Sequence, residues 1–146
     1  MIENETVRPY LGSCLCGSVK YSVEKIEKEM AHCHCTMCRK FHGAEFATFG
    51  EAATENFRWL AGKETLQEYR GDNGTKRLFC GNCGSSLIFI PANDTGKFVE
   101  FSLGTLDSVI QNKPDAHIFT NYSAPWSSVT DGLPRYSEGR GSAKKT

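Results

Sequence analysis

Seven cysteines in 146 residues constrain this chain more than any other feature of its sequence. They form three groups, and an odd number of cysteines cannot close completely into disulfides within one chain. The N-terminal residues MIENETVRPY contain no apolar run, so they lack the pattern of a secretion signal. We therefore expect a cytoplasmic protein with reduced thiols, in which the cysteines bind metal.

The first and last cysteine groups together offer the ligands of a closed zinc site. The CGNCG motif at residues 80–84 has the spacing of a zinc knuckle, and its final glycine lets the chain turn back toward the sulfurs. Cys14 and Cys16 share one face of an extended segment, so a local bend brings both sulfurs to one ion. Four thiolates leave no position for a substrate, which predicts a structural role. Spacing alone also allows Cys14 and Cys16 to share an ion with Cys33 and Cys35.

The middle cysteine group offers an incomplete set of ligands. Cys33, Cys35 and Cys38 supply three thiolates, and an open fourth position is typical of a catalytic or substrate-binding zinc. His32 and His34 are the competing fourth ligands, but His34 faces away from its two neighbouring cysteines if the segment is extended. We therefore favour an open site. Three thiolates leave a divalent ion with net negative charge, which suits a soft fourth ligand such as a substrate thiol.

Two cations follow the middle group directly. Arg39 and Lys40 are candidate substrate-binding residues, because they can balance the thiolates or bind a substrate carboxylate. Solvated surface charge is an equally good explanation for both. Zinc-dependent deamination is excluded, because Cys35 stands where a deaminase has its glutamate and Phe79 stands where it has a proline.

The turn residues and apolar periodicity predict a mainly β fold of short antiparallel sheets stapled by zinc. Glycines punctuate the chain at the spacing that short strands require. The expected strands span 19–23, 45–49, 65–69, 76–79, 86–90 and 99–103, and helical turns are expected at 36–41 and 106–110. We assign residues 1–9 to an N-terminal extension, 10–137 to a single zinc domain and 138–146 to a disordered tail.

The charge balance narrows the class of partner. Lys plus Arg and Asp plus Glu both number 17, so the net charge is zero and nothing favours nucleic acid or an anionic membrane. The longest apolar run, Leu87–Ile90, is far shorter than the roughly 20 residues that span a bilayer. We expect small-molecule partners, and the sequence does not specify an oligomeric state.

Four motifs of this chain resemble the glutathione-dependent formaldehyde-activating enzyme family, which includes centromere protein V. They are GSCLCGSVKY at 12–21, CHCTMCRKFHGAEF at 33–46, CGNCGSSL at 80–87 and SLGTLD at 102–107, and the likeness spans about residues 10–137. The resemblance implies a β-tent fold with two zinc ions per chain. It implies that a structural zinc is bound by Cys14, Cys16, Cys80 and Cys83. It also implies that a catalytic zinc is bound by Cys33, Cys35 and Cys38.

The resemblance also implies an activity. The family condenses formaldehyde with glutathione to S-hydroxymethylglutathione, which is a carbon–sulfur lyase reaction run in reverse. His117 and Trp126 lie in a segment similar to a C-terminal element of the family, so His117 is a candidate acid or base and Trp126 a candidate substrate-binding residue. Core or loop packing is the ordinary alternative for both. The alternative function is a non-catalytic zinc module that binds a thiol compound or a protein, with His32 or His34 closing the middle site.

Overall fold

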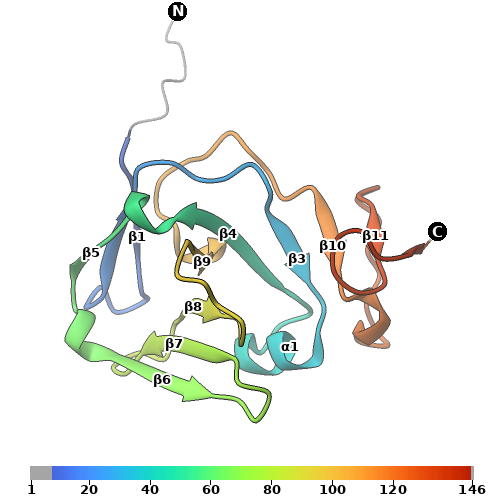
Figure 1. Ribbon diagram of the computed structural model, residues 1–146, viewed down its shortest axis with the longest axis horizontal. Helices are drawn as coiled ribbons and strands as arrows, with labels where there is room; N and C mark the ends of the chain where they lie inside the picture. Colours follow the sequence, from blue (N-terminus) through green and yellow to red (C-terminus); the bar gives the residue numbers. More distant parts are fainter. Residues whose placement is uncertain (1–7, 146) are drawn as a thin grey trace, which may run out of the picture. The chain divides into compact units, whose positions relative to one another are not determined.

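The computed structural model describes residues 8–145 (Figure 1). These residues form two compact units. Of the described residues, unit 1 comprises 8–28 and Gly50–Asn112, and unit 2 comprises Glu29–Phe49 and 113–145. The units are therefore interleaved along the chain and are not consecutive domains. The predicted zinc domain, 10–137, contains parts of both units, and its assignment as one domain stays a prediction. Most of the expected N-terminal extension lies outside the described residues.

Unit 1 consists of antiparallel strands. One sheet has the order β1-β2-β5, with β1 at Tyr10–Ser13, β2 at Lys20–Val23 and β5 at Phe57–Ala61. The strands β9 (Phe98–Ser102), β8 (Ser86–Ile90), β7 (Lys76–Cys80) and β6 (Leu66–Arg70) lie side by side in that order. Short 3-10 helices occupy Thr54–Asn56, Lys63–Thr65 and Leu103–Thr105.

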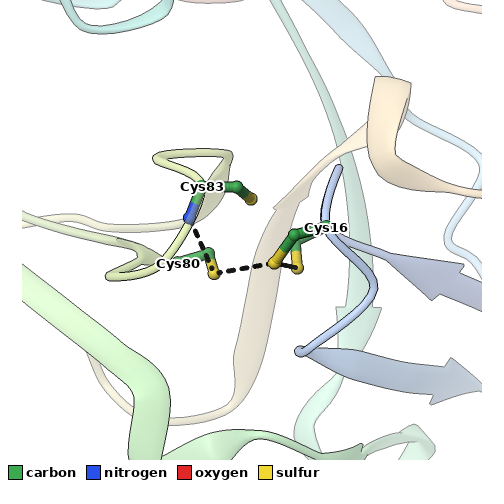
Figure 2. A group of neighbouring side chains, drawn as sticks. Cys16, Cys80 and Cys83 are labelled. Atoms are coloured by element: carbon green, nitrogen blue, oxygen red, sulfur yellow. Dashed lines mark hydrogen bonds between the residues drawn. The ribbon is translucent and has the colours of Figure 1, made fainter.

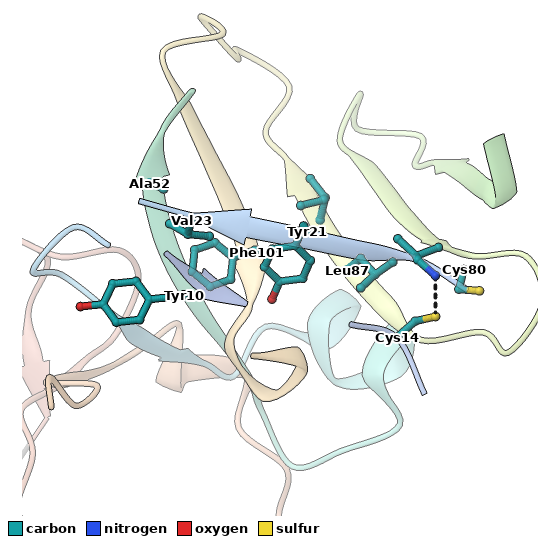
Figure 3. Packing of buried hydrophobic residues seen from close by; sticks show 10 residues of the cluster. Tyr10, Cys14, Tyr21, Val23, Ala52, Cys80, Leu87 and Phe101 are labelled. Carbon is teal, nitrogen blue, oxygen red and sulfur yellow. Dashed lines mark hydrogen bonds between the residues drawn. The ribbon is translucent and has the colours of Figure 1, made fainter. Parts of the chain in front are cut away.

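A large apolar cluster fills unit 1 and reaches the outer cysteines. Figure 3 shows Phe101, Tyr21 and Leu87 in a row that ends at Cys14 and Cys80, and all five are buried. The Tyr21 ring lies against the backbone of the residue opposite it on β1, where a Cβ would clash with the ring, so only glycine fits at position 12. The Tyr21 hydroxyl hydrogen bonds with the Thr105 hydroxyl at 2.7 Å, which satisfies its polar end.

Unit 2 is a mixed sheet with one short helix. Its strands have the order β12-β11-β10-β3-β4, with β3 at Ala31–Cys33, β10 at Ala116–Ile118, β11 at Arg135–Tyr136 and β12 at Lys144–Lys145. The strand β4, Ala47–Ala53, begins in unit 2 and ends in unit 1. The helix α1 spans Thr36–His42, and a 3-10 helix spans Thr120–Tyr122. Strand β10 is parallel to both β3 and β11.

The mainly β fold is confirmed, and several details differ from the sequence-based expectations. The predicted helical turn at 36–41 is α1, whereas 106–110 contains no helix because Leu106 makes an antiparallel bridge to Gly12. Strand β10 pairs in parallel because its partner β3 lies far away in the sequence and needs no hairpin. Neither long-range pairing leaves a local signal in the sequence.

The C-terminal segment, expected to be disordered, is ordered as far as residue 145. Strands β11 and β12 pair antiparallel, and Lys145 Nζ donates a hydrogen bond to the Thr120 carbonyl at 3.3 Å. The Arg140 guanidinium binds the Asp115 carboxylate at 2.5 Å and the Met30 carbonyl at 3.1 Å. These contacts are polar and long-range, so the apolar content of the segment does not reveal them. Within residues 8–145, no helix is long and apolar enough to cross a membrane.

Candidate metal centres

The first and last cysteine groups meet in unit 1, as predicted. Cys14 and Cys16 lie in the turn between β1 and β2, and Cys80 and Cys83 lie where β7 turns into β8. Figure 2 shows Cys16 of the first group beside Cys80 and Cys83 of the last. The Sγ atom of Cys16 is 3.6 Å from that of Cys14 and 3.9 Å from that of Cys80, and all four Sγ atoms lie within 4.8 Å of one another. A tetrahedral zinc with Zn–S bonds of about 2.3 Å requires sulfurs about 3.8 Å apart. The four-thiolate cluster therefore fits zinc.

Hydrogen bonds around the four-thiolate cluster favour the thiolate form. The Ser85 hydroxyl, 3.2 Å from Cys83 Sγ, lowers the pKa of Cys83 to about 5, and Ser18 lowers the pKa of Cys16 to about 7. Burial instead raises the pKa of Cys80 to about 11. The Cys80 sulfur accepts the backbone N–H groups of residues 82 and 83, a turn that Gly84 completes with a φ of 83°. A divalent cation would hold all four sulfurs deprotonated.

The middle cysteine group meets in unit 2 at the junction of β3 and α1. Cys33 ends β3, Cys35 is the N-cap of α1, and Cys38 lies one helical turn later. The Cys35 sulfur accepts the Cys38 backbone N–H at 3.2 Å, and the three Sγ atoms lie within 4.8 Å of one another. This three-thiolate cluster is therefore built almost entirely from local sequence.

The donor set of the three-thiolate cluster fits a cation and leaves one ligand position. Hydrogen bonds with the thiols of Cys35 and Cys38, together with burial, raise the pKa of Cys33, so a divalent cation is needed to hold three thiolates together. Among the described residues, neither His32 nor His34 belongs to this ligand group. His34 Nε2 is instead 2.8 Å from His117 Nδ1, and His32 Nδ1 is 2.7 Å from the Thr48 hydroxyl.

The two cations after the cluster have different surroundings. Arg39 is half-buried on α1, and its Nε donates to the Tyr122 carbonyl at 3.1 Å. Lys40 is exposed. Over residues 8–145, neither side chain forms an ion pair with a carboxylate. Both charges are thus available to an anionic ligand, and Arg39 is the one whose position is fixed.

His117 and Trp126 differ clearly in how much of each side chain is exposed to solvent. Trp126 is 67% exposed, which excludes core packing as the explanation for it. His117 is 0% exposed, and its ring contacts His34 through Nδ1 and Asp131 through Nε2, each at 2.8 Å. Both ring nitrogens of His117 already have hydrogen-bond partners, so neither is free to contact a substrate in this arrangement. A direct role of His117 in proton transfer stays a prediction.

The structure also reveals a histidine cluster that the sequence did not predict. His32, His117 and Asp131 bring three ligand atoms within 4.8 Å of one another in unit 2. Burial lowers the pKa of His32 and lowers that of His34 to about 4, so both rings are neutral at physiological pH. The hydrogen bond from His117 lowers the pKa of Asp131. Asp131 precedes Gly132 in a segment that looks like an ordinary turn, so its sequence carries no signal of this contact.

Comparisons with known proteins identify the family of this chain. The chain is 26% identical over 121 residues to a Schizosaccharomyces pombe protein named an uncharacterized lyase, which covers 77% of this chain and 86% of the relative. A crystal structure of a Rhodobacter sphaeroides protein matches with a TM-score of 0.57 and 26% identity, covering 69% of this chain and 91% of that one. The sequence model of a family described as "Glutathione-dependent formaldehyde-activating enzyme" matches residues 9–122. The chain therefore belongs to the glutathione-dependent formaldehyde-activating enzyme family.

Proposed function

We propose that this protein is a zinc-dependent carbon–sulfur lyase that adds formaldehyde to the thiol of glutathione at the three-thiolate cluster. Family membership and the likeness to a protein named a lyase support the reaction class. One observation carries the assignment to this cluster: Cys33, Cys35 and Cys38 lie together without a fourth ligand from the described residues. A four-thiolate cluster has no such position, so it has the structural role.

The chain's own residues determine where the thiol reacts. Cys33, Cys35 and Cys38 would hold zinc, which when bound lowers the pKa of a coordinated thiol and keeps it as a thiolate. In the overall reaction the thiol loses its proton and its sulfur forms a bond to the aldehyde carbon, while the carbon–oxygen double bond becomes a single bond and the oxygen gains a proton. The reaction is an addition, so it needs no oxidant or reductant. Holding the thiol in one place contributes by proximity.

Arg39 is the proposed carboxylate-binding residue. Glutathione carries two carboxylates, and a guanidinium can bind a carboxylate through two parallel hydrogen bonds. The contact with Tyr122 orients Arg39 through Nε only, so its two terminal nitrogens stay available. Lys40 adds a second positive charge on the exposed side of α1. This pair would also offset the net negative charge of a zinc bound by three thiolates.

Trp126 and His117 are secondary candidates, for covering the substrate and for proton transfer respectively. The exposed Trp126 ring offers a flat apolar surface that can cover a bound substrate. Ser127 beside it donates a hydrogen bond to the Glu45 carboxylate at 2.6 Å, which anchors this segment within unit 2. An acid or base role for His117 would require one of its nitrogens to exchange its present partner for the substrate.

The test combines metal counting, thiol binding and turnover on one preparation. Native mass spectrometry of the zinc-loaded full chain should show two zinc ions and, with glutathione present, one added glutathione. Exchange spectroscopy with carbon-13 formaldehyde should then show faster interconversion of free and glutathione-bound formaldehyde than in buffer. Cys35→Ser should abolish both the adduct and the rate increase, and cysteine in place of glutathione tests the thiol specificity.

The matched control is Lys63→Gln, which removes a lysine from unit 1 and should leave binding and turnover unchanged. Arg39→Gln should weaken glutathione binding by about tenfold, as expected for a lost charged hydrogen bond. Two zinc ions without a glutathione adduct would overturn the lyase proposal. The non-catalytic zinc module would then be the better description.

A further inference from the structure

The register of three strands in unit 2 aligns three polar side chains. Strand β10 pairs with β3 so that His117 lies opposite His32, and β3 pairs with β4 so that His32 lies opposite Thr48. Neighbouring residues at one level of a sheet point to the same face, so the side chains form one row. The centroids of the two imidazole rings are 4.7 Å apart.

A carboxylate completes this row. Asp131 Oδ2 lies 2.8 Å from His117 Nε2, and Asp131 Oδ1 accepts the Leu133 backbone N–H at 3.0 Å. The second contact fixes the carboxylate so that Oδ2 faces the histidines. The Asp131 side chain is 42% exposed, so an ion can reach the group from solvent even though the His117 ring is buried.

We propose that His32, His117 and Asp131 form a third metal site, for a divalent first-row transition metal such as Zn²⁺, Fe²⁺ or Co²⁺. Their ligand atoms already lie within 4.8 Å of one another. Two imidazole nitrogens and one carboxylate oxygen are a donor set that such ions bind, and three ligands leave open positions for water or substrate. The site is separate from both cysteine clusters and does not depend on the proposed lyase reaction.

The hydrogen bonds behind the three ligands are those that metal-binding side chains require. A histidine that binds metal through one nitrogen uses the other in a hydrogen bond that fixes its ring. His32 Nδ1 has such a bond with the Thr48 hydroxyl, and His117 Nδ1 has one with His34 Nε2. This arrangement leaves Nε2 of each ring as the ligand atom. The Phe46 ring lies against both rings, with centroid distances of 4.6 Å and 5.6 Å, and forms an apolar wall.

Metal binding would replace the hydrogen bond between His117 and Asp131. The hydrogen on His117 then moves from Nε2 to Nδ1, and the hydrogen on His34 moves from Nε2 to Nδ1, so that His117 Nδ1 donates to His34 Nε2 and each neutral ring keeps one hydrogen. A filled site occupies His117 Nε2. The third metal and an acid or base role for that nitrogen are therefore mutually exclusive, which gives the proposal a consequence for the predicted role of His117.

Cobalt distinguishes the third site from the thiolates. The full chain is first loaded with two equivalents of zinc, which thiolates bind more tightly than they bind cobalt. Added Co²⁺ should then bind as one further equivalent, visible as d–d absorption without a sulfur-to-cobalt charge-transfer band. Native mass spectrometry should count two zinc ions and one cobalt ion in the same molecule.

Variants decide which residues bind the cobalt. Asp131→Asn and His32→Asn should each lose the third equivalent, and Thr48→Val should weaken it by about tenfold because it removes the outer hydrogen bond. Asp72→Asn and His42→Asn are the matched controls and should keep it. Retention of two zinc ions shows that a variant is folded. The proposal is overturned if the native chain binds no third ion, or if folded Asp131→Asn and His32→Asn still bind one.

Discussion

The two cysteine clusters differ in what surrounds them. Cys14 and Cys80 of the four-thiolate cluster belong to the large apolar cluster of unit 1, together with Tyr21 and Phe101. In unit 2 the corresponding apolar cluster has only three buried members, and two of them are the ligands Cys33 and Cys38 themselves. The four-thiolate cluster is thus part of a well-filled core. The three-thiolate cluster instead supplies most of the buried residues of the small core around it.

This difference gives a physical basis for the two roles that we propose. Ligands that are continuous with a core transmit the loss of their metal to every strand packed there, so metal binding and folding are one event. The three-thiolate cluster is formed by the end of β3 and the start of α1, and its ligands lie within six residues of sequence. Loss of its metal should loosen a local segment and leave unit 1 folded.

The largest loss of folding stability is expected for Cys83→Ser. A structural zinc contributes on the order of 10 kcal/mol in small zinc peptides, which is comparable to the whole stability of a domain. The variant should therefore lose zinc from unit 1 and unfold or aggregate. Circular dichroism melting and zinc analysis measure this, with Ser85→Ala as a control that keeps all four sulfurs. A folded Cys83→Ser protein would show that unit 1 is stable without its metal.

A smaller loss of folding stability is expected for Cys35→Ser. Serine is a good N-cap, so it can still accept the Cys38 N–H that begins α1. The cost is then the lost linkage to zinc, about 3 kcal/mol or less when free zinc is a hundredfold above Kd. Hydrogen exchange should report faster exchange in 31–42 and unchanged exchange in β7 and β8. Equal loss of protection in both units would remove the distinction between the clusters.

A substitution at Glu100 tests the pH dependence of the stability of unit 1 without changing a cysteine of either cluster. Burial, with Glu51 and Asp94 nearby, raises the pKa of Glu100 from 4.5 to about 7. The protonated form therefore stabilises the folded state below about pH 4.5, and this contribution is lost as the pH rises through about 7. Relative to the native chain, Glu100→Gln should gain about 1 to 3 kcal/mol at about pH 8 and almost nothing at about pH 4.

Urea unfolding of both proteins at the two pH values measures this difference, and zinc effects cancel in the comparison. The exposed Glu64→Gln is the control and should show no such pH dependence. A Glu100→Gln protein whose advantage did not grow with pH would show that this carboxyl ionises at its ordinary pKa.

The smallest effect on stability is expected for Trp126→Ala in unit 2. An exposed side chain outside the core changes the free energy of unfolding by about 0.5 kcal/mol or less. If the ring covers the substrate, glutathione binding should weaken by about threefold to tenfold, the range expected for one aromatic contact. Calorimetric titration and thermal melting separate the two effects. A lower Tm with unchanged binding would assign Trp126 to packing.

Much of the secondary structure could be predicted from local pattern. The expected strand at 86–90 is β8 with the same bounds, and the turn after Cys35 is α1. The predicted strand at 45–49 begins later and is longer, because β4 continues to Ala53. Strands β1, β3 and β10 were not predicted, since each is short and owes its pairing to partners distant in the sequence.

The sequence by itself determined the grouping of the cysteines, because ligands two or three residues apart reach one ion through local geometry. It also determined that the last group forms a knuckle and that the middle group begins a helix. Only the tertiary structure decided which cysteine groups lie together, since Cys16 and Cys80 meet across 64 residues. It likewise decided that His34 turns to His117, 83 residues away, and that Asp131 joins His32 and His117. Contacts between distant residues depend on strand register, which no local pattern specifies.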